Sequence, residues 1–157
     1  MSGALRLRPA TQADAQLLFD WANEPEVRAQ SFQEAPIAWE THCAWLAGVL
    51  ADPGARLYIM LEDTEPVGQV RLQQQPSGAW RISYSIERSH RGQGYGKAIL
   101  KYLADIAIER HCGRMEWICL DWNAPSLAFY RSIGAIPMDE WTVQRMNEET
   151  VKRFVTE

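Results

Sequence analysis

Hydrophobic and polar positions change their spacing several times along the chain, which predicts a mixture of strands and helices. Strict alternation, as in the stretch Leu5-Arg6-Leu7-Arg8, is typical of a half-buried strand. Apolar residues three and four apart, as at Trp39, Cys43 and Leu46, are typical of an amphipathic helix. On this basis we expect strands over 5–9, 57–61, 67–72, 80–86, 115–120 and 141–146, helices over 15–22, 37–50, 97–108 and 125–132, and a short turn over 26–28.

The order of these elements predicts an α/β fold with one sheet. The three middle strands are separated by the turn-rich segments DTEP and QPSG, which favours an antiparallel meander. Thr11 followed by Asp14 three residues later is typical of a helix start. We therefore expect one domain over 1–157, a single mixed, mostly antiparallel sheet flanked by helices, with 147–157 as a charged tail or short helix.

Composition excludes several classes of protein. The 157 residues are 46% hydrophobic and 23% charged, and 16 basic against 20 acidic residues leave a net charge of −4, so no nucleic-acid partner is expected. No apolar run approaches the roughly 18 residues of a membrane span, and the N-terminus does not resemble a secretory signal. Cys43, Cys112 and Cys119 lack CxxC spacing, which indicates reduced thiols and a cytoplasmic location.

The stretch SHRGQGYGKAIL at 89–100 places three glycines between a strand and a helix. Free N–H groups and the helix dipole make such a turn an anion site, and Arg91 and Lys97 add positive charge. A phosphate-binding P-loop is excluded, because only three residues separate Gly92 from Gly96 and Ala98 follows Lys97. The dinucleotide pattern GxGxxG fails as well, because its last glycine would have to stand at position 97.

The pattern Arg91-x-x-Gly94-x-Gly96 instead resembles the pyrophosphate loop of the GNAT family of N-acetyltransferases. A second stretch, NAPSLAFYRSIGA at 123–135, is similar to the other signature of that family. The resemblance implies a GNAT fold with acetyl-CoA as co-substrate in the cleft between strands 4 and 5. It also implies a small-molecule amine as acceptor, no metal, and a possible homodimer.

Transfer of an acetyl group to an amine requires a neutral amine, donors for the oxygen of the tetrahedral intermediate, and a proton for the departing thiolate. The resemblance assigns the thioester to the end of the strand 80–86, the pantetheine arm to Asn123, and protonation of the sulfur to Tyr130. The acetyl-CoA-binding residues implied in this way are Tyr84, Ser85, Ile86, Arg91, Gly92, Gln93, Gly94, Tyr95, Gly96, Lys97 and Asn123.

Two residues are candidates for the general base, and ordered water is a third possibility. Glu87 ends the fourth strand and either acts through water or is simply solvated. His42 is the second candidate, because an unperturbed histidine side chain has a pKa near 6.5, which suits proton transfer near neutral pH. Helical spacing places it beside Trp39 and Trp45, so it is either a partly buried core residue or a residue of the substrate cleft.

The acceptor is predicted from two partial resemblances. Residues 5–50 are similar to the amino-sugar acetyltransferases of the pseudaminic acid pathway, whereas residues 115–146 are similar to diamine acetyltransferases. A polyamine requires acidic residues in its cleft, but the strand 80–86 contains Arg81 and no acid. We therefore predict a nucleotide-linked amino sugar, bound by Arg28, His42 and Arg81.

Other acceptor classes remain open. A polyamine or another small amine is one alternative, and a protein N-terminus or lysine is another. A non-catalytic acetyl-CoA-binding module is a third, although the presence of Tyr130 and Asn123 argues against it.

Overall fold

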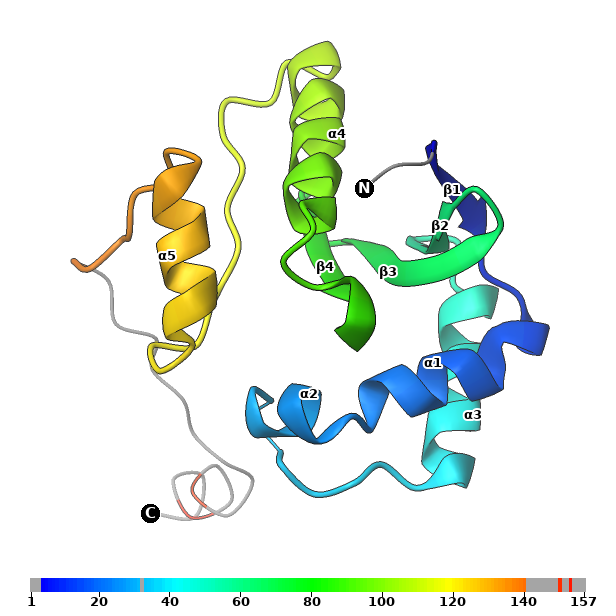
Figure 1. The fold of residues 1–157 in the computed structure, drawn as a ribbon. Coiled ribbons are helices and arrows are strands. Elements are labelled where there is room, and N and C mark those ends of the chain that lie inside the picture. The colour runs from blue at the N-terminus through cyan, green and yellow to red at the C-terminus, as the bar shows by residue number, and fades with distance from the viewer. Residues whose placement is uncertain (1–3, 32, 141–149, 151–152, 154–157) are drawn as a thin grey trace. The chain divides into compact units, whose positions relative to one another are not determined.

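The computed structural model describes residues 4–31, 33–140, 150 and 153. The chain divides into two compact units, Met1–Ile118 and Cys119–Glu157, and each is described by itself. The first unit contains, in chain order, β1 (Leu5–Pro9), η1 (Gln12–Asp14), α1 (Ala15–Ala22), α2 (Pro25–Ala29), α3 (Trp39–Ala51), β2 (Ala55–Glu62), β3 (Glu65–Gln74), β4 (Trp80–Ile86), η2 (Arg88–His90) and α4 (Tyr95–Glu109) (Figure 1).

The four strands form one sheet in the order β1-β2-β3-β4, and every neighbouring pair is antiparallel. The predicted meander of the three middle strands is therefore confirmed, with β2 and β3 longer than expected. The α/β fold class is also confirmed, as an antiparallel sheet flanked by helices. The mixed strand direction is not found among the described strands.

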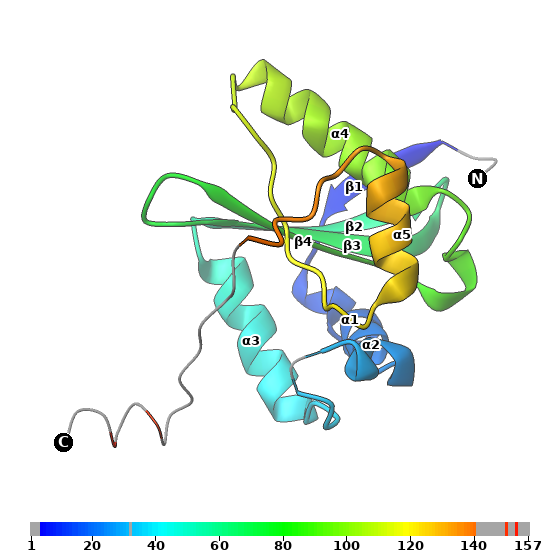
Figure 2. The ribbon, with the colours of Figure 1, turned by 90° about the vertical axis from the view of Figure 1, so that its left-hand side faces the viewer.

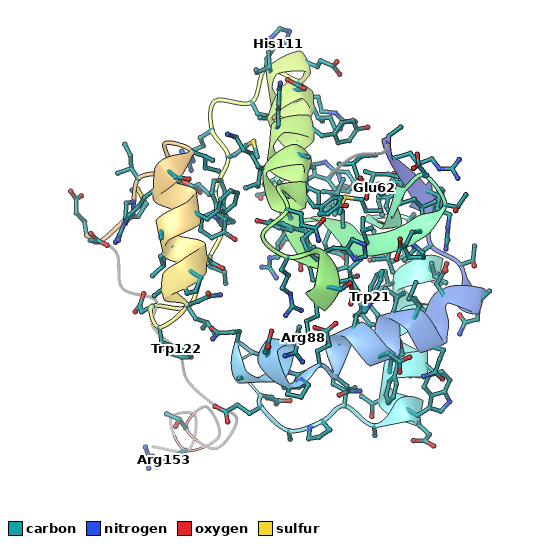
Figure 3. The ribbon with its side chains drawn as sticks, viewed as in Figure 1. Trp21, Glu62, Arg88, His111, Trp122 and Arg153 are labelled. Atoms are coloured by element: carbon teal, nitrogen blue, oxygen red, sulfur yellow. The ribbon has the colours of Figure 1, made fainter. Side chains whose placement is uncertain are left out.

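The sheet has a helical layer on each face. Successive side chains along a strand point to opposite faces, and both faces of the sheet carry buried apolar side chains. Leu57, Ile59 and Leu61 of β2 are buried on one face, in a cluster with residues of α1 and α3. Met60, between them, is buried on the opposite face in a cluster that includes residues of α4. Figures 1 and 2 show α1 and α3 on one side of the sheet and α4 on the other. Side chains from both faces are drawn in Figure 3, where Trp21 marks the α1 layer.

The start of the first helical segment follows the predicted capping pattern. The Asp14 carboxylate accepts a hydrogen bond from the Thr11 backbone N–H at 2.8 Å. Arg8 Nη2 donates to the other carboxylate oxygen of Asp14 at 2.6 Å. The hydrogen bond from Arg8 is the main reason why the pKa of Asp14 lies below its ordinary value. This pair connects β1 to the beginning of α1.

The strand expected over 115–120 is wrong, since these residues are not part of any strand. An apolar segment such as MEWICL indicates a possible strand, but a strand forms only where a neighbour completes its backbone hydrogen bonds. The expected strand over 141–146 lies outside the described residues. In the second unit the expected helix is present as α5 (Ala124–Ser132). No helix in the described part of the chain is long and apolar enough to cross a membrane.

Candidate active site

The segment between β4 and α4 has the backbone geometry that its glycines predict. Gly92 and Gly94 have φ angles of 76° and 95°, in the region that favours glycine. A Cβ atom added to either residue would have no other atom within 4 Å. Glycine is therefore required at these two positions by backbone conformation rather than by crowding, and the space around the turn is open.

Helix α4 begins directly after this turn, with Gly94 as its N-cap. The first intrahelical bond is donated by the N–H of Ala98 to the carbonyl of Gly94 at 3.0 Å. The N–H groups of Tyr95, Gly96 and Lys97 therefore precede the regular hydrogen-bond ladder. Lys97 is exposed. The turn and the first helical turn together can bind an anion through backbone donors, the helix dipole and one ammonium group.

Tyr95 follows the glycine turn directly, and its buried side chain stabilises the turn. Its side chain is 1% exposed, and its hydroxyl donates to Glu62 Oε2 at 2.5 Å. Glu62 lies at the end of β2, beside α4 (Figure 3). The Tyr95 ring also meets the His90 ring edge-on, with centroids 5.6 Å apart. Tyr95 is one of the predicted cofactor-binding residues. Because its side chain is buried, only its backbone is available to a ligand.

Glu87 is the N-cap of η2 and is held by three hydrogen bonds to one oxygen. Its Oε2 accepts from the Ser89 N–H at 2.9 Å and from the Ser89 hydroxyl at 2.5 Å, and it lies 2.6 Å from His90 Nδ1. Burial raises the pKa of Glu87, but these bonds together outweigh it and lower the pKa to about 2. A general base works best with a pKa near the working pH, so this environment does not favour Glu87 in that role.

His90 is a hydrogen-bond partner of Glu87 that the sequence analysis did not predict. It lies directly before the glycine turn, and its other ring nitrogen, Nε2, is 3.7 Å from Glu65 Oε1. A histidine three residues after a carboxylate at a strand end is a weak local signal. In the structure this spacing matters because η2 brings the side chains of Glu87 and His90 together.

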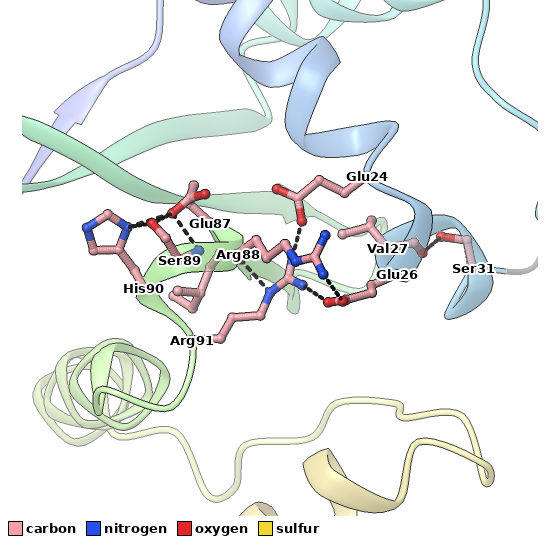
Figure 4. A network of polar contacts seen from close by, with 10 residues as sticks. Glu24, Glu26, Val27, Ser31, Glu87, Arg88, Ser89, His90 and Arg91 are labelled. Carbon is pink, nitrogen blue, oxygen red and sulfur yellow. Dashed lines mark hydrogen bonds and ion pairs between the residues drawn. The ribbon is translucent and has the colours of Figure 1, made fainter.

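Arg91 points toward α2 instead of lying free at the turn (Figure 4). Its Nε donates to the Ile86 carbonyl at 3.0 Å, and its Nη1 donates to Glu26 Oε2 at 2.6 Å. Its Nη2 is paired with Glu24. All three nitrogens of this predicted phosphate-binding group therefore have acceptors within the protein.

The end of β4 is packed closely against β3. Gly68 pairs with Ile86, and the next pair is Gln69 with Ser85. A Cβ atom at Gly68 would lie 2.5 Å from the Ser85 carbonyl oxygen and 3.3 Å from the Ile86 Cα. Gly68 thus sets the distance between the two strands where the predicted thioester segment ends. In the sequence, the signal for this close approach of two strands is a single glycine inside a predicted strand.

His42 is buried in the α1–α3 layer, at 2% exposure. Its Nε2 lies 2.9 Å from the Ala15 carbonyl oxygen, and its ring contacts the rings of Phe19, Trp39 and Trp45. The structure thus favours the core interpretation of His42. A catalytic or substrate-binding role would need a ring nitrogen that faces solvent or substrate, which this burial does not provide.

Arg28 on α2 is largely occupied by backbone acceptors. Its Nη2 donates to the Gln33 carbonyl at 2.5 Å, and its Nη1 donates to the Ala22 carbonyl at 3.4 Å. Its Nε is buried without a hydrogen-bond partner in the described structure. A pocket of about 300 Å³ adjoins this residue and is lined by Asn23, Pro25, Arg28, Ala29, Glu34 and Pro36.

Arg71 and Arg81 lie diagonally across the β3–β4 pair, where Arg71 is opposite Ser83 and Arg81 is opposite Gln73. The Arg71 guanidinium stands 5.7 Å from the centre of a Trp45 ring. Burial, and then the charge of Arg81, lower the pKa of Arg71. No ion pair between either arginine and a described carboxylate is present. Two neighbouring cations on this face can attract an anionic group.

The second unit carries two further predicted residues on or next to α5. The Asn123 side chain accepts a hydrogen bond from the Ser126 N–H at 3.3 Å and caps the helix. Tyr130 is partly exposed, and its ring lies 5.4 Å from that of Phe129. The structure thus brings Glu87, Arg91 and the glycine turn together in the first unit, whereas in the second unit Asn123 caps the start of α5 and Tyr130 lies near the end of that helix. Among the described residues, no group of three or more His, Cys, Asp or Glu is placed to hold a metal ion.

Comparisons with known proteins identify the domain family of the chain. Residues 4–136 match the family described as the acetyltransferase (GNAT) domain. Thialysine N-epsilon-acetyltransferase of Bos taurus is 27% identical over 148 residues, covering 84% of this chain and 77% of that protein. The structure of an integron cassette protein of Vibrio cholerae superimposes with a TM-score of 0.69 at 21% identity, over 98% of both chains. Spermidine N-acetyltransferase of Vibrio cholerae, solved with CoA and spermine, gives a TM-score of 0.67 at 15% identity, over 83% and 79% of the two chains.

Proposed function

Because the chain belongs to the acetyltransferase (GNAT) domain family, we propose that it transfers the acetyl group of acetyl-CoA to the primary amine of a small molecule that carries a second cation. The observation that carries this proposal is the turn with positive φ angles at Gly92 and Gly94, which leads from β4 into the N-terminus of α4. That arrangement suits the diphosphate of acetyl-CoA. The backbone donors of the turn and of Tyr95 to Lys97 bind it, and the Lys97 ammonium adds charge.

The reaction joins the amine nitrogen to the acetyl carbonyl carbon. The carbonyl oxygen becomes an oxyanion, which backbone groups near Ile86 stabilise. The carbon–sulfur bond then breaks, the thiolate of CoA takes a proton from Tyr130, and solvent returns a proton to the Tyr130 phenolate. The acetylated nitrogen loses one proton to solvent, so the products are an amide and free CoA thiol.

The amine must be neutral when it attacks. An alkylamine with a pKa near 10.4 is neutral in fewer than about one in a thousand molecules at pH 7. Glu87, with a pKa of about 2, is a weak proton acceptor. We therefore assign proton removal to ordered water rather than to Glu87 or the buried His42. On this assignment kcat/KM rises about tenfold per pH unit above neutrality.

The names of the relatives support a cationic acceptor. Thialysine, the acceptor named for the bovine relative, has two amino groups, and spermidine has three. An amine of this class brings a second positive charge to an acidic protein whose net charge is −4.

A nucleotide-linked amino sugar is the second candidate, and one observation favours it. Arg71 and Arg81 form a pair of neighbouring cations on the face of the sheet that Trp45 covers. A diphosphate on the acceptor would neutralise this pair, whereas a polyamine would be repelled by it.

An amine panel distinguishes the candidates. Release of CoA thiol from acetyl-CoA is measured with thialysine, spermidine, a nucleotide-linked amino sugar and a peptide with a free N-terminus. We expect the highest kcat/KM with thialysine or spermidine. Highest turnover of the amino sugar, lowered at least tenfold by Arg81→Gln, would establish the second candidate. Tight CoA binding without turnover of any amine would contradict both and indicate a binding module.

A further inference from the structure

A cluster of four charged side chains connects α2 to the segment that precedes the glycine turn (Figure 4). Arg91 is paired with Glu24 and Glu26, and Arg88 Nη2 lies 3.0 Å from Glu26 Oε1. Two arginines thus face two glutamates, so the formal charges of the cluster cancel. The glutamates lie 62 to 67 positions before the arginines in the chain, so only the fold brings them together.

Helix α2 depends on this cluster more than a longer helix would. It has five residues and none of them is buried. An isolated helix of this length is not stable in water, so tertiary contacts must hold it in place. The ion pairs at its first turn are therefore a main connection between α2 and the end of β4.

The same contacts explain why Arg91 is poorly placed to bind phosphate. Its three guanidinium nitrogens already donate to Ile86, Glu24 and Glu26. The Glu24 side chain is only 16% exposed. Moving Arg91 to a phosphate would leave that partly buried carboxylate without its partner, which is costly.

We propose that Arg91, Glu24 and Glu26 are positioning residues, which tie α2 to the end of β4 and hold the entry of the glycine turn in the shape that binds acetyl-CoA. Arg91 acts through the backbone of the turn and does not touch the diphosphate. The proposal rests on the proposed function, because it assigns acetyl-CoA to that turn.

A ligand at the turn is then coupled to α2. Ordering of the turn by the diphosphate fixes Arg91, and Arg91 in turn fixes the two glutamates at the start of α2. Arg28 lies on the same helix and lines the pocket of about 300 Å³. The cluster therefore connects the acetyl-CoA side of the site to a pocket near α2, and the coupling is reciprocal.

The test uses two variants of the cluster and two controls on other elements. The cluster variants are Arg91→Gln and the double change Glu24→Gln with Glu26→Gln. The controls are Glu40→Gln on α3 and Arg110→Gln at the end of α4, both exposed positions. Hydrogen exchange of the backbone amides 26–31 is measured without ligand and with CoA, and the Kd of CoA is measured by calorimetry.

Without ligand, we expect amides 26–31 to exchange at least tenfold faster in both cluster variants than in the unaltered protein and the controls. CoA should slow this exchange in the unaltered protein but not in the cluster variants. Both cluster variants should weaken CoA binding by a similar factor of about three to ten. A positioning role predicts that CoA binding is weakened equally whether the cation of Arg91 is removed or the two anions of Glu24 and Glu26.

The opposite pattern would overturn the proposal. If Arg91 binds the diphosphate directly, Arg91→Gln weakens CoA binding while the glutamate variant tightens it, because Arg91 is released. Unchanged exchange of amides 26–31 in the unliganded cluster variants would also overturn it. Absence of CoA binding in the unaltered protein would contradict the proposed function instead, and the unliganded measurement would still decide whether the cluster holds α2.

Discussion

Gly68 on β3 lies so close to Ser85 on β4 that a Cβ atom at position 68 would stand 2.5 Å from the Ser85 carbonyl oxygen. Real Cβ atoms do not approach oxygen so closely, so any side chain at this position must push the strands apart. The displaced segment is the end of β4, directly before Glu87 and the glycine turn. The packing of two strands thus sets the position of the proposed thioester-binding backbone.

Gly68→Ala should therefore reduce both stability and activity. Overpacking of this kind costs about 1–3 kcal/mol of unfolding free energy, which urea denaturation measures. We expect kcat/KM to fall as well, because the Ile86 backbone moves. Gly48→Ala is the matched control, since a Cβ at Gly48 in α3 meets nothing within 4 Å. That change should be neutral or stabilise the helix by up to about 1 kcal/mol. Equal stability of the Gly68→Ala variant and the unaltered protein would refute the steric argument.

Gly94→Val should weaken acetyl-CoA binding at least tenfold, or about 1.4 kcal/mol. The φ angle of 95° at Gly94 is unfavourable for a β-branched residue, so the turn must change shape and its backbone donors with it. Calorimetry gives the Kd. Gly78→Val is the control, because Gly78 has a similar φ of 83° in the turn between β3 and β4. Both variants should lose stability, but only the first should lose affinity. The same loss of affinity in both would show that strain alone explains it.

Glu87→Gln should destabilise the protein in a pH-dependent manner. The pKa of Glu87 is lowered from 4.5 to about 2 in the folded state. Its stabilising effect is therefore complete above pH 4.5 and disappears as the pH falls toward 2. The difference in unfolding free energy between variant and unaltered protein should shrink from pH 6 to pH 3 in urea titrations.

The same variant tests the role of Glu87 in catalysis. If water removes the amine proton, kcat/KM should keep its rise with pH and change by less than about threefold after correction for the folded fraction. Glu40→Gln serves as the control in both measurements, since Glu40 is exposed on α3. Loss of the pH dependence in Glu87→Gln would instead identify Glu87 as the general base.

His42→Ala should lower the unfolding free energy by about 2–4 kcal/mol, because it removes a buried ring and leaves the Ala15 carbonyl without its contact. The activity of the folded molecules should remain within about twofold of the unaltered protein. Turnover measured well below the unfolding temperature checks this. A tenfold fall in kcat with unchanged stability would restore His42 as a catalytic candidate.

Tyr130→Phe should lower kcat about 10²–10⁴-fold, the usual range for a general acid, and leave the Kd of acetyl-CoA nearly unchanged. The hydroxyl matters mainly as negative charge develops on the departing sulfur. Tyr102→Phe is the control, because Tyr102 is 54% exposed on α4. Full kcat in Tyr130→Phe would mean that the thiolate leaves without a proton from this residue.

The sequence by itself determined the features that depend on neighbouring residues. Alternation over Leu5–Pro9 predicted β1, and Thr11 with Asp14 predicted the start of the first helical segment. The glycines at 92 and 94 predicted an unusual turn before α4, and both have positive φ angles. Local spacing is sufficient in these cases because hydrogen bonds, caps and φ angles involve residues only a few positions apart.

Only the tertiary structure decided which groups meet across long distances in the chain. The charge of Arg91 predicted a phosphate ligand, but in the fold this residue is paired with Glu24, the N-cap of α2, and with Glu26. The pattern at His42 allowed a core or a cleft position, and packing against α1 buries it. The apolar segment 115–120 was predicted to be a strand, but no strand forms there. Partners, burial and strand pairing depend on where distant segments are placed, and residue spacing along the chain does not contain that information.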